Sequence, residues 1–451
     1  MSQARFHRIF IANRGEIAVR IIKACQSLGL ETALGVSSAD KTSLAARLAD
    51  RVVCIGPPKS AESYLNKNAL IHACLATECD ALHPGYGFLS ERADFARACE
   101  LAGIHFIGPQ PDAIESMGDK SNARRIATRA GVPVVPGCDL VPDATAAIDI
   151  SKGVGFPLLL KARAGGGGRG MRIVSQPGEL QEAFRSASAE AEAAFGDGTL
   201  YMERFIRRGK HIEVQVLGDG HGKVIHLFER DCSTQRRHQK LIEEAPSPFL
   251  DTETRSAMLS AAVKLAESVN YRGAGTVEFI VDADTKEFFF LEMNTRIQVE
   301  HPVTEMLTGI DLVKAQIKIA ETGSLEFTQE KIKSSGHVIE CRINAEDPAR
   351  GFSPSPGRIT TWRPPSASYA RLDALCEQND TIVPFYDSLI GKLIVKGDDR
   401  ADAINKLLSC LEDFQIEGVT TTVAFHRMTL NHLDFKNGNV TTRWVEESGM
   451  A

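Results

Sequence analysis

Short apolar runs alternate with amphipathic stretches in the first quarter of the chain. Residues 8–12 form an apolar run, and apolar side chains then recur at helical spacing from Ile17 to Leu28, where Gly29 follows. Further strands are expected at 32–36, 51–55, 80–82 and 106–107, and further helices at 69–76 and 95–102. Strands that alternate with helices indicate a parallel sheet covered on both faces, so we expect an α/β domain over about 1–115.

The pattern changes after a helical connector at 112–131. Two expected strands, 157–161 and 171–174, flank a run of glycines, and a helix at 178–194 and a strand at 200–206 follow. This small unit, about 135–205, has the character of a lid.

The remaining chain predicts longer strands and then a mixed region. From 211 to 294 the strands are linked as hairpins, with one helix at 252–268, which favours a mainly antiparallel sheet. Beyond about 330 we expect further short strands and one helix near 401–414. The chain is therefore expected to have three parts, with the lid inside the second: 1–115, 116–330 and 331–451.

The composition is that of an ordinary globular protein, with 43% hydrophobic and 24% charged residues among 451 and a formal net charge of -6. A mildly acidic chain is a poor candidate for nonspecific nucleic-acid binding, which needs a basic surface. None of the ten cysteines forms a CxxC pair, and no histidine cluster has zinc spacing, so we expect buried reduced thiols. Because no secretory signal pattern and no apolar run of ~18 residues occur, we expect a soluble, cytoplasmic protein that binds neither nucleic acid nor membrane.

Four consecutive glycines, Gly165, Gly166, Gly167 and Gly168, stand between two expected strands. In a dinucleotide-binding fold a helix would follow such a run, whereas here a strand follows. A strand–glycine loop–strand unit makes a flap whose backbone N–H groups can close over phosphates, and Lys161 just before it can reach the same phosphates. The alternative is a hairpin tip that binds nothing.

Two carboxylates flank a predicted hairpin. Strands at 275–281 and 288–294 are joined by a short turn, and the alternation of side chains lets Glu278, Glu292 and Asn294 converge. Two buried carboxylates among phenylalanines would repel one another, and a bound divalent ion would relieve the repulsion. Oxygen ligands suit Mg²⁺ bridging nucleotide phosphates, so these three residues are the candidate metal ligands. The alternative is a pair of solvent-facing glutamates on an edge strand.

A dense positive cluster stands out in this acidic protein. It consists of Arg236, Arg237, His238 and Lys240, and Gln235 precedes it. Positive charge beside a predicted metal–phosphate site fits an anionic substrate. The alternative is a solvated face, which is the more common fate of a charge run.

The segment 294–302 comes directly after the candidate metal strand. Arg296 can bind a carboxylate-like anion through its guanidinium fork, and Glu300 can act as general base for a bound acid within hydrogen-bond reach. The alternative is an ordinary loop with an internal ion pair. With the glycine flap and the carboxylates, this segment indicates phosphoryl transfer from ATP to a small oxyanion, and the lack of a GxxxxGK[ST] motif excludes a P-loop enzyme.

Seven blocks, in order along the chain, resemble biotin carboxylase of the ATP-grasp superfamily. The resemblance spans about 6–445, and its most specific blocks are the long ones at 83–91 and 292–302. The other blocks lie at 13–18, 117–120, 165–171, 236–240 and 386–387. The resemblance implies an α/β and α+β architecture, namely an ATP-grasp fold with a Rossmann-like N-terminal domain, a small mobile lid and a C-terminal mixed α+β domain.

The resemblance also implies a reaction, in which ATP, bicarbonate and biotin give carboxybiotin, ADP and phosphate through carboxyphosphate. The residues that would contact ATP are Lys120, Lys161, Gly165, Gly166, Gly167, Gly168, Met171, Glu203, His211, Gln235 and His238. Mg²⁺ or Mn²⁺ would be held by Glu278, Glu292 and Asn294. Bicarbonate would be held by Lys240, Arg296, Gln298 and the backbone of Val299, with Glu300 as the base, and Arg342 would stabilise the biotin enolate.

Two positions depart from the family pattern. Arg163 stands where relatives often have a small residue, and we assign it no role. Asn379 stands where many relatives have glycine; asparagine is the next-best residue for a left-handed turn, so we expect the turn to be kept. The family uses this region near its dimer interface, and the resemblance implies a homodimer.

Three functions stay open: an active biotin carboxylase, another ATP-grasp enzyme such as a carboxylating purine-synthesis ligase or half of a carbamoyl-phosphate synthase, and a non-catalytic ATP-binding protein. The blocks at 231–240 and 292–302 argue against the second, and the intact candidate metal ligands and Glu300 argue against the third. No Met-Lys-Met biotinylation site occurs, so we expect biotin on a separate carrier protein and a separate carboxyltransferase subunit. Acetyl-CoA is the default final acceptor; another acyl-CoA, pyruvate or urea would need only a different partner.

Overall fold

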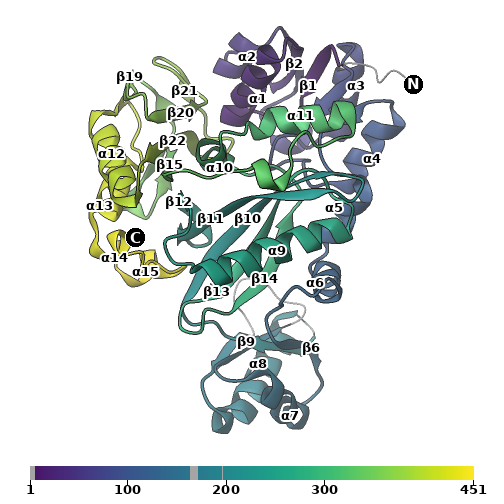
Figure 1. Cartoon of the computed structure of the whole chain (residues 1–451), viewed down its shortest axis with the longest axis vertical. Helices are drawn as coiled ribbons and strands as arrows, with labels where there is room; N and C mark the ends of the chain where they lie inside the picture. The colour runs from purple at the N-terminus through teal and green to yellow at the C-terminus, as the bar shows by residue number, and fades with distance from the viewer. Residues whose placement is uncertain (1–5, 163–170, 196, 451) are drawn as a thin grey trace. The chain divides into compact units, whose positions relative to one another are not determined.

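The structure is a computed structural model that describes residues 6–162, 171–195 and 197–450 (Figure 1). The chain divides into two compact units. The first is built from Met1–Val132, Lys210–Ile280 and Leu291–Ala451, and the second from Pro133–Gly209 and Val281–Phe290.

A five-stranded sheet opens the first unit, in the order β3-β2-β1-β4-β5. All its pairings are parallel, which confirms the prediction from the alternating pattern. Helix α1 buries its apolar stripe against this sheet because its isoleucines recur at helical spacing. The strands are β1 (Arg8–Ile11), β2 (Glu31–Ser37), β3 (Arg51–Gly56), β4 (Ala81–His83) and β5 (His105–Phe106), and the helices are α1 (Gly15–Ser27), α2 (Leu44–Leu48), α3 (Lys67–Ala76), α4 (Ala93–Leu101), α5 (Pro111–Gly118) and α6 (Lys120–Arg129).

An eight-stranded sheet follows, in the order β14-β13-β10-β11-β12-β15-β22-β20. The registers from β10 to β20 are antiparallel. The hairpin pattern at 211–294 predicted this for β10, β11 and β12, whereas β15, β22 and β20 join the sheet from beyond residue 330. The strands are β10 (Gly209–Asp219), β11 (Val224–Arg236), β12 (Gln239–Ala245), β13 (Arg272–Asp282), β14 (Phe288–Asn294), β15 (His337–Asn344), β20 (Ala370–Ala374) and β22 (Leu389–Gly397). The helix expected at 252–268 is confirmed as α9 (Thr252–Ser268), whose first turn is capped by Asp251.

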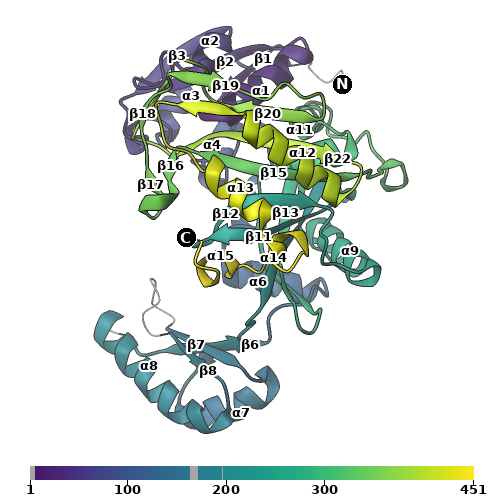
Figure 2. The ribbon, with the colours of Figure 1, turned by 90° about the vertical axis from the view of Figure 1, so that its left-hand side faces the viewer.

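Two helices cover the β12–β15–β22 part of this sheet from opposite faces. Val303 and Leu307 of α10 (His301–Thr308) pack on Ala245, Val338 and Ile394. Helix α12 (Arg400–Asp413) packs on β15 and β22 and runs along them in Figure 2, with Ile339 and Val395 in its core. Because neighbouring residues of a strand point to opposite faces, each strand sends one set of side chains toward α10 and the other toward α12.

The second unit contains a four-stranded sheet in the order β6-β9-β7-β8 with antiparallel pairings. Its strands are β6 (Gly137–Val141), β7 (Leu158–Ala162), β8 (Arg172–Val174) and β9 (Leu200–Arg204), and its helices are α7 (Ala144–Val154) and α8 (Leu180–Phe195). The helices and the sheet enclose a separate apolar core that includes Leu160, Phe184 and Met202. The glycine run 165–168 and Arg163 lie outside the described residues.

The C-terminal region has more helices than the sequence pattern indicated. Only α12 was expected, but α13 (Val423–Asn431), α14 (Leu433–Lys436) and α15 (Trp444–Glu447) follow it, in addition to α11 (Leu312–Thr322) before the region. These last helices are short, so they carry little periodicity. The remaining strands are β16 (Glu346–Asp347), β17 (Ser353–Pro354), β18 (Gly357–Arg358), β19 (Thr361–Arg363), β21 (Thr381–Ile382) and β23 (Gln415–Glu417).

Asn379 adopts the left-handed conformation that the sequence analysis expected, with φ of 76°. Its side chain accepts a hydrogen bond from Arg358. Among the described residues, no helix is both long and apolar enough to cross a bilayer.

Candidate active site

Lys240, on the hairpin of β11 and β12, is the first cation of the candidate site. Its register shifts between the pairs Thr234–Ile242 and Gln235–Lys240, so one extra residue of β12 is inserted there. Such a bulge reverses the alternation of the strand, and it turns Lys240 to the face that Glu243 occupies. The position of Lys240 therefore depends on a backbone irregularity that the residue pattern does not predict.

The ammonium of Lys240 lies among three carboxylates. Its Nζ atom donates to Glu213 at 2.6 Å, to Glu278 at 2.9 Å and to Glu300 at 2.7 Å. Burial alone would lower the pKa of Lys240, but the three carboxylates raise it well above the usual value. The lysine is therefore a permanent cation at the centre of the site.

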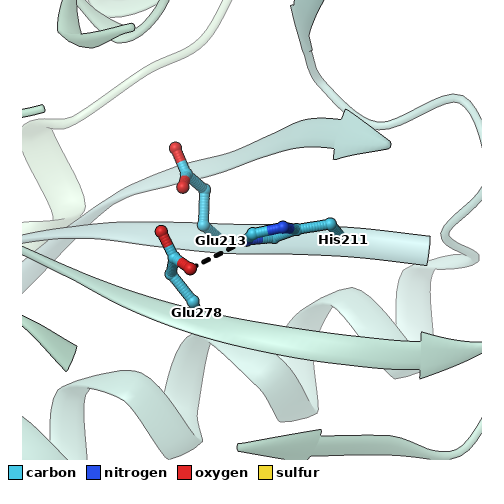
Figure 3. A group of neighbouring side chains, drawn as sticks. All are labelled: His211, Glu213 and Glu278. Carbon is cyan, nitrogen blue, oxygen red and sulfur yellow. Dashed lines mark ion pairs between the residues drawn. The ribbon is translucent and has the colours of Figure 1, made fainter. Parts of the chain in front are cut away.

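His211 and Glu213 of β10 lie close to Glu278 of β13, the neighbouring strand of the sheet, as Figure 3 shows. The Nε2 atom of His211 lies 2.9 Å from Glu278, and one ligand atom of each residue falls within 4.8 Å of the others. That spacing could suit a metal ion, but the Lys240 ammonium already contacts both glutamates. The ammonium takes the place that a cation would need between Glu213 and Glu278.

Arg230 of β11 forms the buried floor of the site. It is fully buried, and it donates to Glu213 at 2.6 Å and to Gln298 at 3.2 Å. Further bonds reach Gln215, Thr304 and Thr276. A buried guanidinium is tolerated when its donors are satisfied in this way, and here it ties the sheet to the segment that carries Glu300.

Glu300 ends the loop between β14 and α10 and is 2% exposed. One carboxylate oxygen accepts from Lys240, and the other accepts from Arg342 at 2.8 Å. Burial would raise the pKa of Glu300, but Lys240, Arg342 and Arg230 hold it well below the usual range. Arg342 also donates to Glu243 at 2.6 Å, so a chain of alternating charges crosses the site.

The rest of this loop is held by specific bonds. Arg296 donates to Glu91 at 2.8 Å and to Asn294 at 3.0 Å. Gln298 donates to Glu278 at 2.8 Å. Lys240, Gln298 and Glu300 therefore share one network with Glu278, while Arg296 is held separately by Glu91 and Asn294.

Two sequence-based expectations need correction. Glu292 was expected to be buried, but its side chain is 44% exposed and lies 3.9 Å from Lys120, because β14 is the edge strand of the sheet. The positive cluster at 235–240 also does not stay together. Arg237 and His238 form the exposed hairpin turn with positive φ values, while Gln235 and Arg236 are buried and Arg236 stacks on Phe352.

The expected nucleotide residues of the second unit form a simpler group. Lys161 of β7 makes an ion pair with Glu203 of β9, the neighbouring strand of the sheet. Burial lowers and Glu203 raises the pKa of Lys161, with a net rise. Met171 is exposed and immediately precedes β8, next to residues outside the described part.

Sequence reasoning missed four buried residues of the first unit. Glu213, Arg230, Glu243 and Glu340 lie on strands that have the pattern of ordinary apolar sheet, and no motif singled them out. The only signal was a charged residue at a position where the alternation predicts burial. Glu243 and Glu340 face each other across β12 and β15, and burial raises the pKa of Glu340 well above its usual value.

Known protein families match the chain along most of its length. The model of the biotin carboxylase N-terminal domain matches residues 5–114, that of the carbamoyl-phosphate synthase L chain ATP binding domain matches 119–328, and that of the biotin carboxylase C-terminal domain matches 340–447. Biotin carboxylase of Nostoc sp. is 52% identical over 98% of this chain and 99% of its own length. One pyruvate carboxylase subunit from Methanothermobacter thermautotrophicus is 48% identical over 98% of this chain and 90% of its own.

A solved relative matches in three dimensions as well. It is the biotin carboxylase domain dimer of 2-oxoglutarate carboxylase from Hydrogenobacter thermophilus, in complex with MgADP, ADP and bicarbonate. The TM-score is 0.87 at 46% identity, over 99% of this chain and 98% of that one. The expected ATP-grasp architecture with mixed α/β and α+β content is confirmed. The chain belongs to the biotin carboxylase family of ATP-dependent ligases.

Proposed function

We propose that this protein carboxylates biotin with bicarbonate at the expense of ATP, and releases ADP and phosphate. The observation that carries the proposal is the setting of Glu300, a buried carboxylate between the cations Lys240 and Arg342. A base that acts on bicarbonate must lie beside cations that bind the anion. The solved Hydrogenobacter relative has bicarbonate and MgADP in its complex, which supports the same ligands here.

The charges around Glu300 suggest how its basicity changes during the reaction. With both cations in contact, Glu300 holds protons poorly because its pKa lies well below the usual range. Bicarbonate bound by Lys240 and Arg296 would compete with Glu300 for the lysine ammonium. Weakening of that contact raises the pKa of the carboxyl, so binding of the anion itself prepares Glu300 to accept the bicarbonate proton.

The proton transfer makes bicarbonate a better nucleophile for the γ-phosphate of ATP. Carboxyphosphate and ADP result, and carboxyphosphate then divides into CO2 and phosphate within the closed site. The phosphate can take the ureido proton of biotin, and Arg342 can stabilise the negative charge that develops on the ring. The ring nitrogen then bonds to CO2, which gives carboxybiotin.

The nucleotide and the metal fit the donors that we assign to them. Lys120, Lys161, Glu203, His211, Gln235, His238, Met171 and the glycines 165–168 are the proposed ATP contacts. Glu278, Glu292 and Asn294 offer only oxygen donors for coordination, which suits Mg²⁺ or Mn²⁺, and the exposed Glu292 carboxylate has only a long contact with Lys120. A divalent ion there would neutralise part of the phosphate charge.

The partner and the final acceptor are further parts of the proposal. Biotin would arrive on a separate carrier protein, and a separate carboxyltransferase subunit would pass the carboxyl group on, with acetyl-CoA as the default acceptor. Relatives named for pyruvate and 2-oxoglutarate carboxylation show that the family serves several acceptors. We also propose a cytoplasmic homodimer, in keeping with the dimer named for the Hydrogenobacter domain.

A second candidate is a biotin-independent ATP-grasp ligase. It draws on the match of 119–328 to the carbamoyl-phosphate synthase ATP binding domain. The biotin carboxylase domains matched on both sides of that segment favour biotin as the acceptor.

The test is ADP release by the purified protein with MgATP and bicarbonate, with and without free biotin. We expect strong stimulation by biotin, and a loss on the order of 100- to 10,000-fold in Glu300→Gln, in line with removal of a general base. Glu244→Gln, which changes a buried glutamate away from the site, is the matched control and should keep its turnover. Bicarbonate-dependent turnover that biotin does not increase would favour the second candidate. No turnover in any condition would contradict both candidate functions.

A further inference from the structure

A buried lysine outside every motif contacts the backbone beside Glu300. Lys392 of β22 is fully buried, and its Nζ atom donates to the carbonyl oxygen of Val299 at 2.8 Å. Val299 immediately precedes Glu300 in the loop from β14 to α10. A buried ammonium is costly unless it is paired and hydrogen-bonded, so its presence here calls for a reason.

The sheet register places Lys392 next to a residue of the proposed site. Arg342 of β15 is its direct cross-strand partner, so both side chains project from the same face of the sheet. Arg342 reaches the side chain of Glu300 at 2.8 Å, while Lys392 reaches the peptide before it. Two adjacent strands therefore hold Glu300 at its carboxylate and at its backbone.

The charge of Lys392 is balanced from a distant part of the chain. Its Nζ atom lies 3.1 Å from Glu16, in the first turn of α1, and the Tyr86 hydroxyl donates to the other oxygen of that carboxylate. Burial raises the pKa of Glu16, and Lys392 opposes the rise. Glu16 and Tyr86 both lie in sequence blocks of the family resemblance, and the structure joins them to Lys392.

The contact with Val299 fixes the orientation of the peptide that precedes Glu300. In a trans peptide the carbonyl and the following N–H point in opposite directions, so a carbonyl held at Lys392 directs the N–H of Glu300 the other way. A reversed peptide would turn the backbone at Glu300 and move its carboxylate away from Lys240 and Arg342. The lysine therefore selects the peptide orientation in which Glu300 keeps both contacts.

We propose that Lys392 is a positioning residue for bicarbonate: neutralised by Glu16, it holds the Val299 carbonyl and thereby fixes the peptide and the carboxylate of Glu300. The inference rests on the proposed function and adds a residue to it. Lys392 contacts neither substrate nor nucleotide and acts only through the loop.

The test compares bicarbonate kinetics in matched variants of the full chain. Lys392→Met with Glu16→Gln removes both charges together, so that no buried charge is left unpaired. We expect this double variant to fold and to bind MgADP like the parent, while kcat/KM for bicarbonate falls on the order of 100-fold, as misplacement of a catalytic group predicts. The KM for ATP should stay within about 2-fold of the parent value, because the defect is confined to the anion loop.

Lys396→Met is the control, because Lys396 lies on the same strand and bonds to the carbonyl of Met306 in α10, away from the loop. It should leave bicarbonate kinetics unchanged. Lys392→Arg is the milder second variant, and it should keep more of the bicarbonate kcat/KM than the methionine variant because it retains a cationic donor.

Three outcomes would overturn the proposal. A folded double variant with parental bicarbonate kinetics would show that Lys392 is only structural, as would equal rises in the KM for ATP and for bicarbonate. A parent protein without bicarbonate-dependent turnover would overturn the proposed function, and the role of Lys392 with it. The assay of the parent protein therefore distinguishes failure of the proposed function from failure of the role of Lys392 alone.

Discussion

Strand β12 carries two adjacent buried glutamates with opposite electrostatic surroundings. Glu243 faces the site, where burial raises its pKa to about 7, Arg342 opposes the rise and Glu300 adds to it. Glu244 faces α12, where burial would also raise the pKa, but hydrogen bonds from His337 and Arg400 lower it to about 2. The residue type, the strand and the depth are the same, so the difference comes from the charges that surround each carboxylate.

The two faces of β12 differ in how well their buried carboxylates are neutralised. On the site face, Glu243 meets Glu340 across the strands, and neither oxygen of Glu340 has a hydrogen-bond partner within the described residues. On the other face, the ion pairs of Glu244 with Arg400 and His337 are satisfied. Carboxylates therefore lie close together on the face of the candidate site, whereas balanced ion pairs on the other face serve stability.

The largest expected effect separates the two arginines that contact these glutamates. Arg342→Met should lower biotin-dependent turnover on the order of 100- to 1,000-fold, because it removes the cation that we propose stabilises the charge developing on biotin. Arg400→Met should change kcat/KM by less than about 2-fold, because its guanidinium serves only the face toward α12. Steady-state kinetics of both variants measure this difference. Equal losses of turnover in the two variants would contradict a functional distinction between the two faces of β12.

Glu244→Gln should destabilise the fold without loss of turnover. Because the pKa of Glu244 is lowered in the folded state, its contribution is complete above the unfolded value of ~4.3 and is lost as pH falls toward about 2. The expected cost at pH 7 is roughly 3 kcal/mol in the free energy of unfolding. Urea denaturation at pH 7 and at pH 3 measures it, and a cost that does not shrink at pH 3 would argue against the ion pairs as its source.

Glu243→Gln should change stability in the opposite direction. The folded protein keeps the Glu243 proton up to about pH 7, so the wild-type carboxyl lowers stability as pH rises from ~4.3 to 7. The variant lacks this term, which is on the order of 3 kcal/mol by the same relation, so it should be more stable than the wild type at pH 8. Turnover should fall because Arg342 loses its anionic partner. A variant that is destabilised most at high pH would contradict this description of the site face.

The sequence predicted the elements well wherever periodicity was strong. The parallel sheet, the helix at 252–268 and the antiparallel hairpins follow from patterns of 3.6 and 2 residues. The segment 294–302 was also recognised, because Arg296, Gln298 and Glu300 are close in the chain. Short-range patterns sufficed for these features.

The remaining features depend on contacts that a pattern does not contain. The bulge that turns Lys240 toward Glu213 is a backbone irregularity, and the separation of Arg236 from Arg237 results from a turn with positive φ. The contact of Lys392 with Val299 joins residues 93 positions apart. Cross-strand register determines which distant residues come into contact, and the register follows from the packing of the whole sheet.

The proposed reaction is tested most directly by transfer of labelled carbon from bicarbonate to free biotin, with MgATP present, in the parent protein and in Glu300→Gln. We expect ATP-dependent formation of acid-labile carboxybiotin by the parent protein. We expect almost none by the variant, although the variant binds MgADP with the parental Kd. Label transfer at the parental rate in Glu300→Gln would contradict the assignment of Glu300 as the base, and no transfer by the parent protein would contradict the proposed reaction itself.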